Sequence, residues 1–274
     1  MKNDDLGNRM KLYENVETAK RFIPTLPVYA RIDGRSFSKF TKDMDKPYDI
    51  YMADCMIETT KYLVEQTNAS MGYTQSDEIS LVWHSEDPKS EIFFSGKVHK
   101  MTSQLAALAS VKFMQLAQVY WPEKVANKLP TFDARVFSLP NRNEAANCFV
   151  WREWDATKNS VSMAAHNIFS HKELQGKKRP EMMDMLMSVG VNWNDYPSLF
   201  KRGTYVSKRE VETTLSQAQM QKIPEEYRPK YGIVKRNHST ALENVPPITK
   251  IENRLGFIFD KEEPILKDGV ENTW

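Results

Sequence analysis

Two stretches of sequence decide the fold: Arg31-Ile32-Asp33-Gly34-Arg35-Ser36-Phe37 and Gly72-Tyr73-Thr74-Gln75-Ser76-Asp77-Glu78-Ile79-Ser80. The first stretch closes an apolar run and predicts a buried strand over Leu26–Asp33. The second lies between two β-prone segments, Met71–Thr74 and Ile79–Trp83, and predicts a hairpin with an acidic turn. One aspartate therefore stands at the end of an expected strand, and another stands at the tip of an expected hairpin.

These two carboxylates, Asp33 and Asp77, are candidates for holding metal ions. Mg²⁺ is usually held by one or two carboxylates together with waters and substrate phosphates. Two such ions, about 3.5–4 Å apart, clamp the attacking and leaving oxygens of a phosphoryl transfer. Spacing alone leaves an alternative open, in which Asp33 starts an ordinary turn and Asp77 and Glu78 form a solvated loop tip.

The order of the expected elements favours a definite fold class. A helix is expected over Tyr48–Asn68, a second helix over about 95–120, and a strand over Thr131–Leu139. Together with the first strand and the hairpin they give the order β-α-β-β-α-β. This is the ferredoxin-like order of an α+β protein, an antiparallel sheet backed by helices. Such a sheet places the end of its first strand beside the central hairpin, which favours the metal interpretation of the two aspartates.

The second half of the chain is less regular. Helical character returns from Glu144 to about Leu174 and again over Glu181–Val189, whereas prolines become dense from Pro224 onward. We therefore expect about fifty C-terminal residues to form loops, an arm and a short terminal strand over Leu255–Phe259.

The composition is that of an ordinary globular chain, with 41% hydrophobic and 27% charged residues among 274. No run of about 18 apolar residues occurs, and Met1-Lys2-Asn3-Asp4-Asp5 lacks the apolar stretch of a signal peptide, so we expect no membrane partner and a cytoplasmic location. Cys55 and Cys148 form no CxxC pair. Two thiols in a reducing compartment are favoured, with a single disulfide as the alternative.

Positive charge is concentrated in one region although the net charge is only +2. Between His171 and Arg236 there are thirteen Lys or Arg residues against eight acids. Such an excess suits a phosphate backbone, and it equally suits a solvated surface of mixed charge.

Five segments together resemble the tRNA(His) guanylyltransferase family, and more closely its template-dependent, Thg-like branch of 3′–5′ polymerases. They are RIDGRSFSKF (31–40), Lys46-Pro47, GYTQSDEISLVW (72–83), FDARVFSLPN (132–141) and WREWDATKN (151–159). The resemblance covers about residues 1–210. It implies a polymerase palm, two Mg²⁺ ions, and attack by the 3′-hydroxyl of an incoming nucleotide on an activated 5′ end of tRNA. It also implies GTP and ATP as nucleotide partners and a homotetramer.

The resemblance assigns roles to individual residues. Asp33, the Gly34 carbonyl and Asp77 match the metal ligands, and Glu78 matches a neighbouring acid that joins Asp33 and Asp77 as a catalytic residue. Residues expected to contact the nucleotide are Gly34, Arg35, Ser36, Phe37, Lys46, Ser76, Lys97 and Lys100. The last two are three apart near a helix start, which favours anions; an ordinary solvated helix face is the alternative for them.

The tRNA-contacting residues that we expect are Arg152, Asn159, Lys172, Lys201, Arg202, Lys208 and Arg209. The chain then divides into a palm-like catalytic core at 1–140, a helical part at 141–215 that binds RNA and nucleotide and is integrated with the core, and an arm with loops at 216–274.

One departure from the family pattern bears on the reaction. Thr157 stands where the eukaryotic guanylyltransferases have a histidine that accompanies 5′-monophosphate activation and untemplated addition of one G. Templated repair of a truncated 5′ end therefore fits better than G addition at position −1. A diguanylate-type cyclase is disfavoured because its Gly-Gly-Asp-Glu-Phe hairpin is absent here, and a non-catalytic tRNA-binding protein is disfavoured by the retained acids and Lys46.

Three tryptophans, Trp151, Trp154 and Trp193, carry large aromatic surfaces suited to base stacking, although burial in the core is the usual state of tryptophan.

Overall fold

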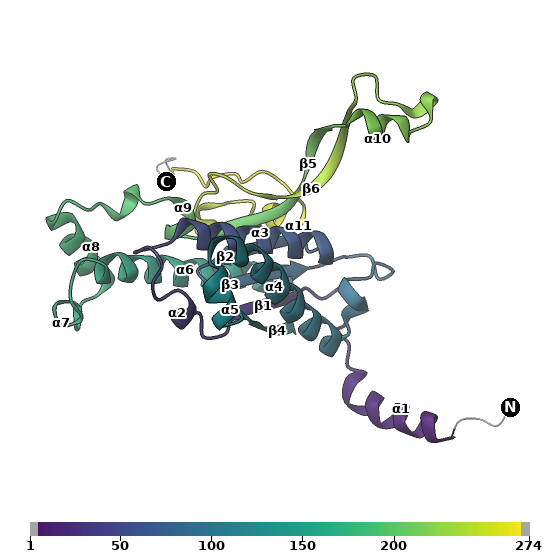
Figure 1. Ribbon diagram of the computed structural model, residues 1–274, viewed down its shortest axis with the longest axis horizontal. Coiled ribbons are helices and arrows are strands. Elements are labelled where there is room, and N and C mark those ends of the chain that lie inside the picture. The colour runs from purple at the N-terminus through teal and green to yellow at the C-terminus, as the bar shows by residue number, and fades with distance from the viewer. Residues whose placement is uncertain (1–4, 270–274) are drawn as a thin grey trace.

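The fold of the computed structural model is built on a single antiparallel sheet. The structure describes residues 5–269. The ends of the expected catalytic core (residues 1–4) and of the expected C-terminal arm (residues 270–274) lie outside the described residues. The strand order is β4-β1-β3-β2-β5-β6 (Figure 1). The strands are β1 (Val28–Gly34), β2 (Met71–Gln75), β3 (Glu78–Trp83), β4 (Phe132–Ser138), β5 (Thr204–Thr214) and β6 (Ile233–Ala241).

The first four strands form the expected ferredoxin-like sheet, in the spatial order 4-1-3-2, so that prediction is confirmed. Helices α3 (Ile50–Thr67) and α4 (Val98–Tyr120) cover one face, as Figure 1 shows. Alternate residues of β1, such as Ala30 and Ile32, are fully buried against them because strand side chains point to opposite faces in turn. Asp49 begins α3 by accepting a hydrogen bond from the Met52 backbone N–H at 2.9 Å.

The opposite face carries α6 (Arg142–His166), which crosses β1, β3 and β2 and forms the expected helix together with α7 (His171–Leu174). Phe149 packs its ring edge-on to Tyr29 and Tyr73 of the sheet, at centroid separations of 5.1 and 6.3 Å. Because only part of this face is covered by α6, its β4 side remains open to solvent. That asymmetry leaves room for a site.

The predicted terminal strand over Leu255–Phe259 is wrong, since the segment forms helix α11 (Arg254–Phe259) and packs the fully buried Phe257 against Tyr205. A short apolar run does not distinguish a strand from a buried helix, and tertiary packing decides.

Residues 204–241 add two strands that the sequence analysis did not predict. β5 pairs with β2 through Gly72↔Val206, and β6 continues along β5 as far as Thr214↔Ile233. The sheet therefore continues past residue 140, where the core was expected to end. The far half of this hairpin extends away from the body and bears α10 (Gln217–Gln221) and the 3₁₀ turn η3 (Glu225–Tyr227) at its end (Figure 1).

Shorter elements complete the chain. An apolar cluster joins the end of α6 to helix α8 (Arg179–Ser188). The presence of α8 confirms the helix expected at Glu181–Val189. Among residues 5–269 no helix is both long and apolar enough to cross a bilayer. The remaining elements are α1 (Asp5–Thr18), α2 (Phe37–Phe40), η1 (Phe93–Gly96), α5 (Pro122–Asn127), η2 (Trp193–Asp195), α9 (Ser198–Lys201) and η4 (Ile248–Lys250).

Glu153 of α6 ties the helix to β5 and to the C-terminal segment. Its carboxylate accepts hydrogen bonds from the Tyr205 hydroxyl and from the Ile248 backbone N–H, both at 2.9 Å. The side chain is almost completely buried, and burial raises its pKa to about 7 in spite of those bonds and of the nearby Arg202 and Arg254.

Replacing Glu153 by glutamine should flatten the pH dependence of stability. The pKa of the folded-state carboxyl, about 7, exceeds the unfolded value of about 4.3, so the wild type loses stability as pH rises through that interval. We expect the free energy of unfolding of Glu153→Gln, relative to wild type, to increase by about 3 kcal/mol between pH 4.5 and 8. Urea unfolding across this range measures it, with the exposed Glu210→Gln as control; parallel profiles for wild type and Glu153→Gln would contradict the argument.

Candidate active site

The structure brings Asp33 and Asp77 together at one end of the sheet. Asp33 lies opposite Glu78 in the pairing of β1 with β3, and the Gly34 N–H donates to the Asp77 carbonyl oxygen at 3.0 Å. Asp77 occupies the turn between β2 and β3, and the Ser76 hydroxyl donates to its carboxylate at 3.2 Å. The expected meeting of the two acids is therefore a property of the fold.

Electrostatics at this point favour a cation. The pKa of Asp77 is raised, first by burial and then by the negative charge of Asp33. Across residues 5–269 no group of three or more His, Cys, Asp or Glu side chains forms a closed metal cage. Two carboxylates with an adjacent backbone carbonyl are hard oxygen ligands, and they fit Mg²⁺ that also keeps waters and substrate phosphates.

The loop after β1 is shaped by Phe37. Its ring is buried among Phe40, Phe113 and Phe132, at centroid distances of 4.9–5.6 Å. A Cβ at Gly34 would lie 2.5 Å from this ring, so only glycine lets the loop close over it. Arg35 and Ser36 are left exposed at the surface of the loop.

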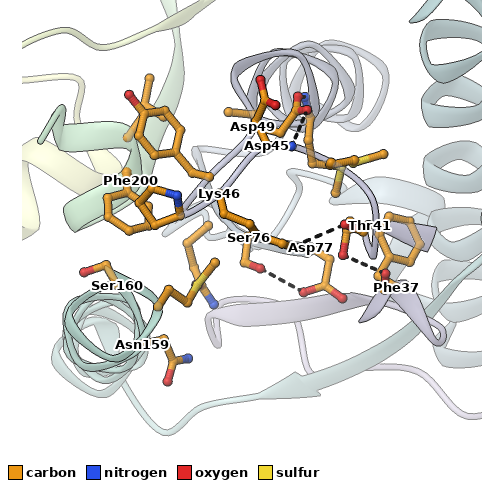
Figure 2. Close-up of a pocket in the computed structure, with 18 of the residues that line it drawn as sticks. Phe37, Thr41, Asp45, Lys46, Asp49, Ser76, Asp77, Asn159, Ser160 and Phe200 are labelled. Atoms are coloured by element: carbon orange, nitrogen blue, oxygen red, sulfur yellow. Dashed lines mark hydrogen bonds between the residues drawn. The ribbon is translucent and has the colours of Figure 1, made fainter. Parts of the chain in front are cut away.

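A cavity of about 420 Å³ opens beside Asp77 (Figure 2). Phe37, Lys46, Ser76 and Asn159, all expected in the site, line it together with Asp77. They come from the α2 loop, the segment before α3, the hairpin turn and α6. Lys46 is exposed at the cavity and reaches the Thr41 carbonyl oxygen at 3.3 Å.

One wall of this cavity was not predicted from the sequence. Tyr48 and Phe200 stack at 4.9 Å with an interplanar angle of 23°, and Met44, Met52 and Met163 add apolar surface. An apolar wall facing a lysine and a carboxylate suits a ring carrying phosphates. Tyr48 lies two residues after Lys46, which was the available signal, but Phe200 is distant in sequence and only folding brings it here.

Lys97 and Lys100, also expected to contact a nucleotide, lie away from Lys46 and Ser76. Lys97 lies just before α4 and forms a backbone β-bridge with Arg21, at the end of the sheet where β1 begins. Both lysines line a separate pocket. The acids lie where β1 ends, near the other end of α4, a helix of 23 residues that spans roughly 35 Å.

Glu78 also differs from its expected role as a catalytic acid. Its buried carboxylate accepts from Arg152 Nε at 2.6 Å and lies 3.2 Å from an Arg31 terminal nitrogen. Burial raises the pKa of Glu78, and the two guanidinium groups partly offset that effect. Glu78 thus joins β3 to β1 and α6 next to Asp33 and Asp77.

The residues expected to contact tRNA divide into two groups. Arg152, Lys201 and Arg202 are buried and bind groups within the protein: Arg152 pairs with Glu78 and Asp155, and the Lys201 ammonium donates to the Asn194 carbonyl. Asn159 and Lys172 are exposed, and Lys208 and Arg209 are half-buried at the base of β5, where they lie 3.6 and 3.8 Å from glutamates.

Comparison with known proteins agrees with the fold. The Thg1 model, described as tRNAHis guanylyltransferase, matches residues 7–140. A bacterial tRNA(His) guanylyltransferase (Thg1)-like protein solved with ATP is 34% identical, with a TM-score of 0.77 over 93% of this chain and 100% of that one. A structure described in the same terms, solved with GTP, is 31% identical, with a TM-score of 0.70 over 93% and 98%.

Curated relatives point the same way. An uncharacterised protein of Acanthamoeba polyphaga mimivirus is 30% identical over 77% of this chain and 80% of its own length. The tRNA(His) guanylyltransferase of Schizosaccharomyces pombe is 27% identical over 72% and 79%. The palm sheet, the paired acids and these matches define the protein as a nucleotidyltransferase. The chain belongs to the tRNA(His) guanylyltransferase family.

Removing Arg152 should destabilise the fold. Arg152→Met leaves the Glu78 carboxylate buried with Arg31 alone, and loss of one partner of a buried pair costs about 3 kcal/mol. Urea unfolding at neutral pH measures this loss, and adding Glu78→Gln should recover part of it because the unpaired charge is gone. The matched control is Arg135→Met, whose exposed pair with Asp133 at 3.8 Å contributes at most about 0.5 kcal/mol. If Arg152→Met and Arg135→Met lowered the free energy of unfolding equally, the role of Arg152 as the buried partner of Glu78 would be contradicted.

Proposed function

We propose that this chain is a template-dependent 3′–5′ nucleotidyltransferase that repairs the 5′ end of tRNA. The observation that carries the proposal is the pair of carboxylates, Asp33 and Asp77, of which Asp77 lines a cavity with an aromatic wall and an exposed lysine, Lys46. The related bacterial proteins were solved with ATP and with GTP, which supports a nucleotide in this cavity. tRNA as the acceptor follows from the family.

In this proposal each lining group has a task. Tyr48 and Phe200 hold the base, while Lys46 and the Ser76 hydroxyl face the phosphates. Two Mg²⁺ ions held by Asp33, the Gly34 carbonyl and Asp77 would supply positive charge to the attacking hydroxyl and to the leaving phosphate. The buried Phe37 and Met52 keep water from one side of the nucleotide, which strengthens the charge interactions. The exposed Arg35 and Ser36 approach the phosphates from the loop after β1.

Selection of the base by pairing with a template is supported by Thr157. Its hydroxyl donates to the Glu153 carbonyl oxygen at 2.9 Å within α6, and Thr157 is absent from the residues that line the cavity. This position therefore offers no hydrogen-bonding group for reading guanine. Watson–Crick pairing with the opposite strand supplies discrimination without such a group.

We further propose a homotetramer in the cytoplasm. Lys97 and Lys100 lie at the end of the sheet remote from Asp33 and Asp77. If these lysines contact the tRNA end that reacts at Asp33 and Asp77, they do so from a second subunit. Within the described chain, Cys55 and Cys148 are free thiols, which suits a reducing compartment. The exposed Asn159 and Lys172 are the expected tRNA contacts that keep solvent-facing side chains.

Loss of either catalytic acid should abolish addition without unfolding the protein. Asp33→Ala or Asp77→Ala removes a ligand that holds charge opposite the transition state, so we expect a fall in rate on the order of a thousandfold. Single-turnover extension of a 5′-triphosphorylated, truncated tRNA measures it. Asp43→Ala, a change at an exposed acid, serves as control. Near-normal turnover of either catalytic variant would favour a non-catalytic tRNA-binding protein or another site.

The choice of nucleotide distinguishes repair from G addition. On a tRNA lacking one 5′ residue, changing the opposing template base from C to A should switch the preferred addition from G to U. A 5′-triphosphate end should react better than a 5′-monophosphate end, because the histidine that accompanies activation is replaced by Thr157. Competition among labelled nucleotides measures both preferences. Persistent G addition to a 5′-monophosphate end in the presence of ATP would instead support the G-specific activity named for the Schizosaccharomyces pombe relative.

A further inference from the structure

Trp151 of α6 is a large aromatic side chain held rigidly at the surface. Its side chain is 47% exposed, yet its ring lies against two guanidinium groups, with the Arg31 and Arg152 carbons 5.1 and 4.5 Å from the ring centroid. Both arginines are fixed by the buried Glu78. An indole whose orientation is fixed beforehand loses little conformational freedom when a flat partner stacks on it.

The position of Trp151 relates it to the reaction. Arg31 precedes Asp33 by two residues on the same face of β1, a separation of about 7 Å. Across the strand, Arg31 and Asp33 pair with the exposed Arg135 and Asp133 of β4. Trp151 therefore borders an open part of the sheet directly beside the catalytic acids.

The nucleotide cavity lies on another side of those acids. From α6 it takes Ala156, Asn159, Ser160, Ser162 and Met163. The nearest of these to Trp151 is Ala156, which lies about 7.5 Å along the helix axis and about 140° around it, on nearly the opposite side of the helix. One base cannot occupy the cavity and stack on Trp151 at once. The indole is therefore available to a second base.

We propose that Trp151 is a positioning residue that stacks on the terminal base of the tRNA 5′ end. This inference rests on the proposed function, in which a tRNA end meets a nucleotide at Asp33 and Asp77. Stacking on an exposed indole is tolerant of base identity because every base has a π-face. That tolerance suits an enzyme whose choice of nucleotide comes from the template. The guanidinium groups beneath the ring add positive charge for the neighbouring phosphates.

The test uses the full-length chain and a truncated tRNA carrying 2-aminopurine as its 5′-terminal base, with no nucleotide added, so that no reaction occurs. We compare Trp151→Ala, the conservative Trp151→Phe, and the control Trp154→Ala. Trp154 is 62% exposed on the same helix. By helical geometry Trp154 lies to one side of Trp151, whereas Asp155, which pairs with Arg152, lies to the other side. Thermal unfolding verifies that each variant is folded.

Wild type and Trp154→Ala should change the 2-aminopurine fluorescence equally on binding, and Trp151→Ala should lose that change and bind the tRNA roughly tenfold to a hundredfold more weakly. Trp151→Phe should fall between them. An abasic 5′ terminus should weaken wild-type binding similarly and remove the difference from Trp151→Ala. The KM for the incoming nucleotide should stay within about twofold, because that base occupies the cavity.

Equal fluorescence and affinity for Trp151→Ala and Trp154→Ala would overturn the inference. A raised nucleotide KM with unchanged tRNA binding would also overturn it, since the stacked base would then be that of the nucleotide. If wild type stacks the terminal base but adds G whatever the template, the proposed function fails and this inference stands.

Discussion

The ion pairs of Glu78 are the constraint on which the site depends. A carboxylate taken out of water costs several kcal/mol unless well-placed charges surround it, and here Arg31 of β1 and Arg152 of α6 provide them. The interaction joins two neighbouring strands and the helix above them at one point. It therefore sets the position of α6 along the sheet, and with it the distance between the acids on the strands and the groups that α6 presents.

The two faces of the sheet explain why the site lies where it does. One face is mostly apolar under α3 and α4, and it fixes the register of β1 because a slip of one residue would turn Ile32 outward and Asp33 into the core. The other face is covered only in part by α6. The uncovered part, on the β4 side, holds Asp33, Asp133 and Arg135 in contact with solvent, so these polar side chains are accommodated without loss of core packing.

Along this second face, α6 separates three environments. Its buried surface carries Arg152 and Glu153 into hydrogen bonds that stabilise the fold. Farther along, Asn159 and Met163 complete the cavity beside Asp77. The exposed Trp151 borders the open sheet near Asp33. Since the helix repeats every 3.6 residues, residues close in sequence have unrelated roles.

The sequence by itself determined the ferredoxin-like order and the meeting of Asp33 with Asp77. These follow from local periodicity, turn chemistry and strand adjacency, which are encoded over a few residues. It did not determine the added strands β5 and β6 or the helix at Arg254–Phe259, because polar hairpins and short apolar runs take their conformation from what they pack against.

The roles of individual charges were decided only by the tertiary structure. Glu78 and Arg152 resemble exposed functional groups in sequence, yet their burial makes them partners of one another. Lys97 and Lys100 are placed by the length of α4 at the far end of the sheet, and Phe200 reaches the cavity only through the packing of α9 against α6. Burial and long-range contact govern the energy of a charge, and neither is a property of the residues beside it in the chain.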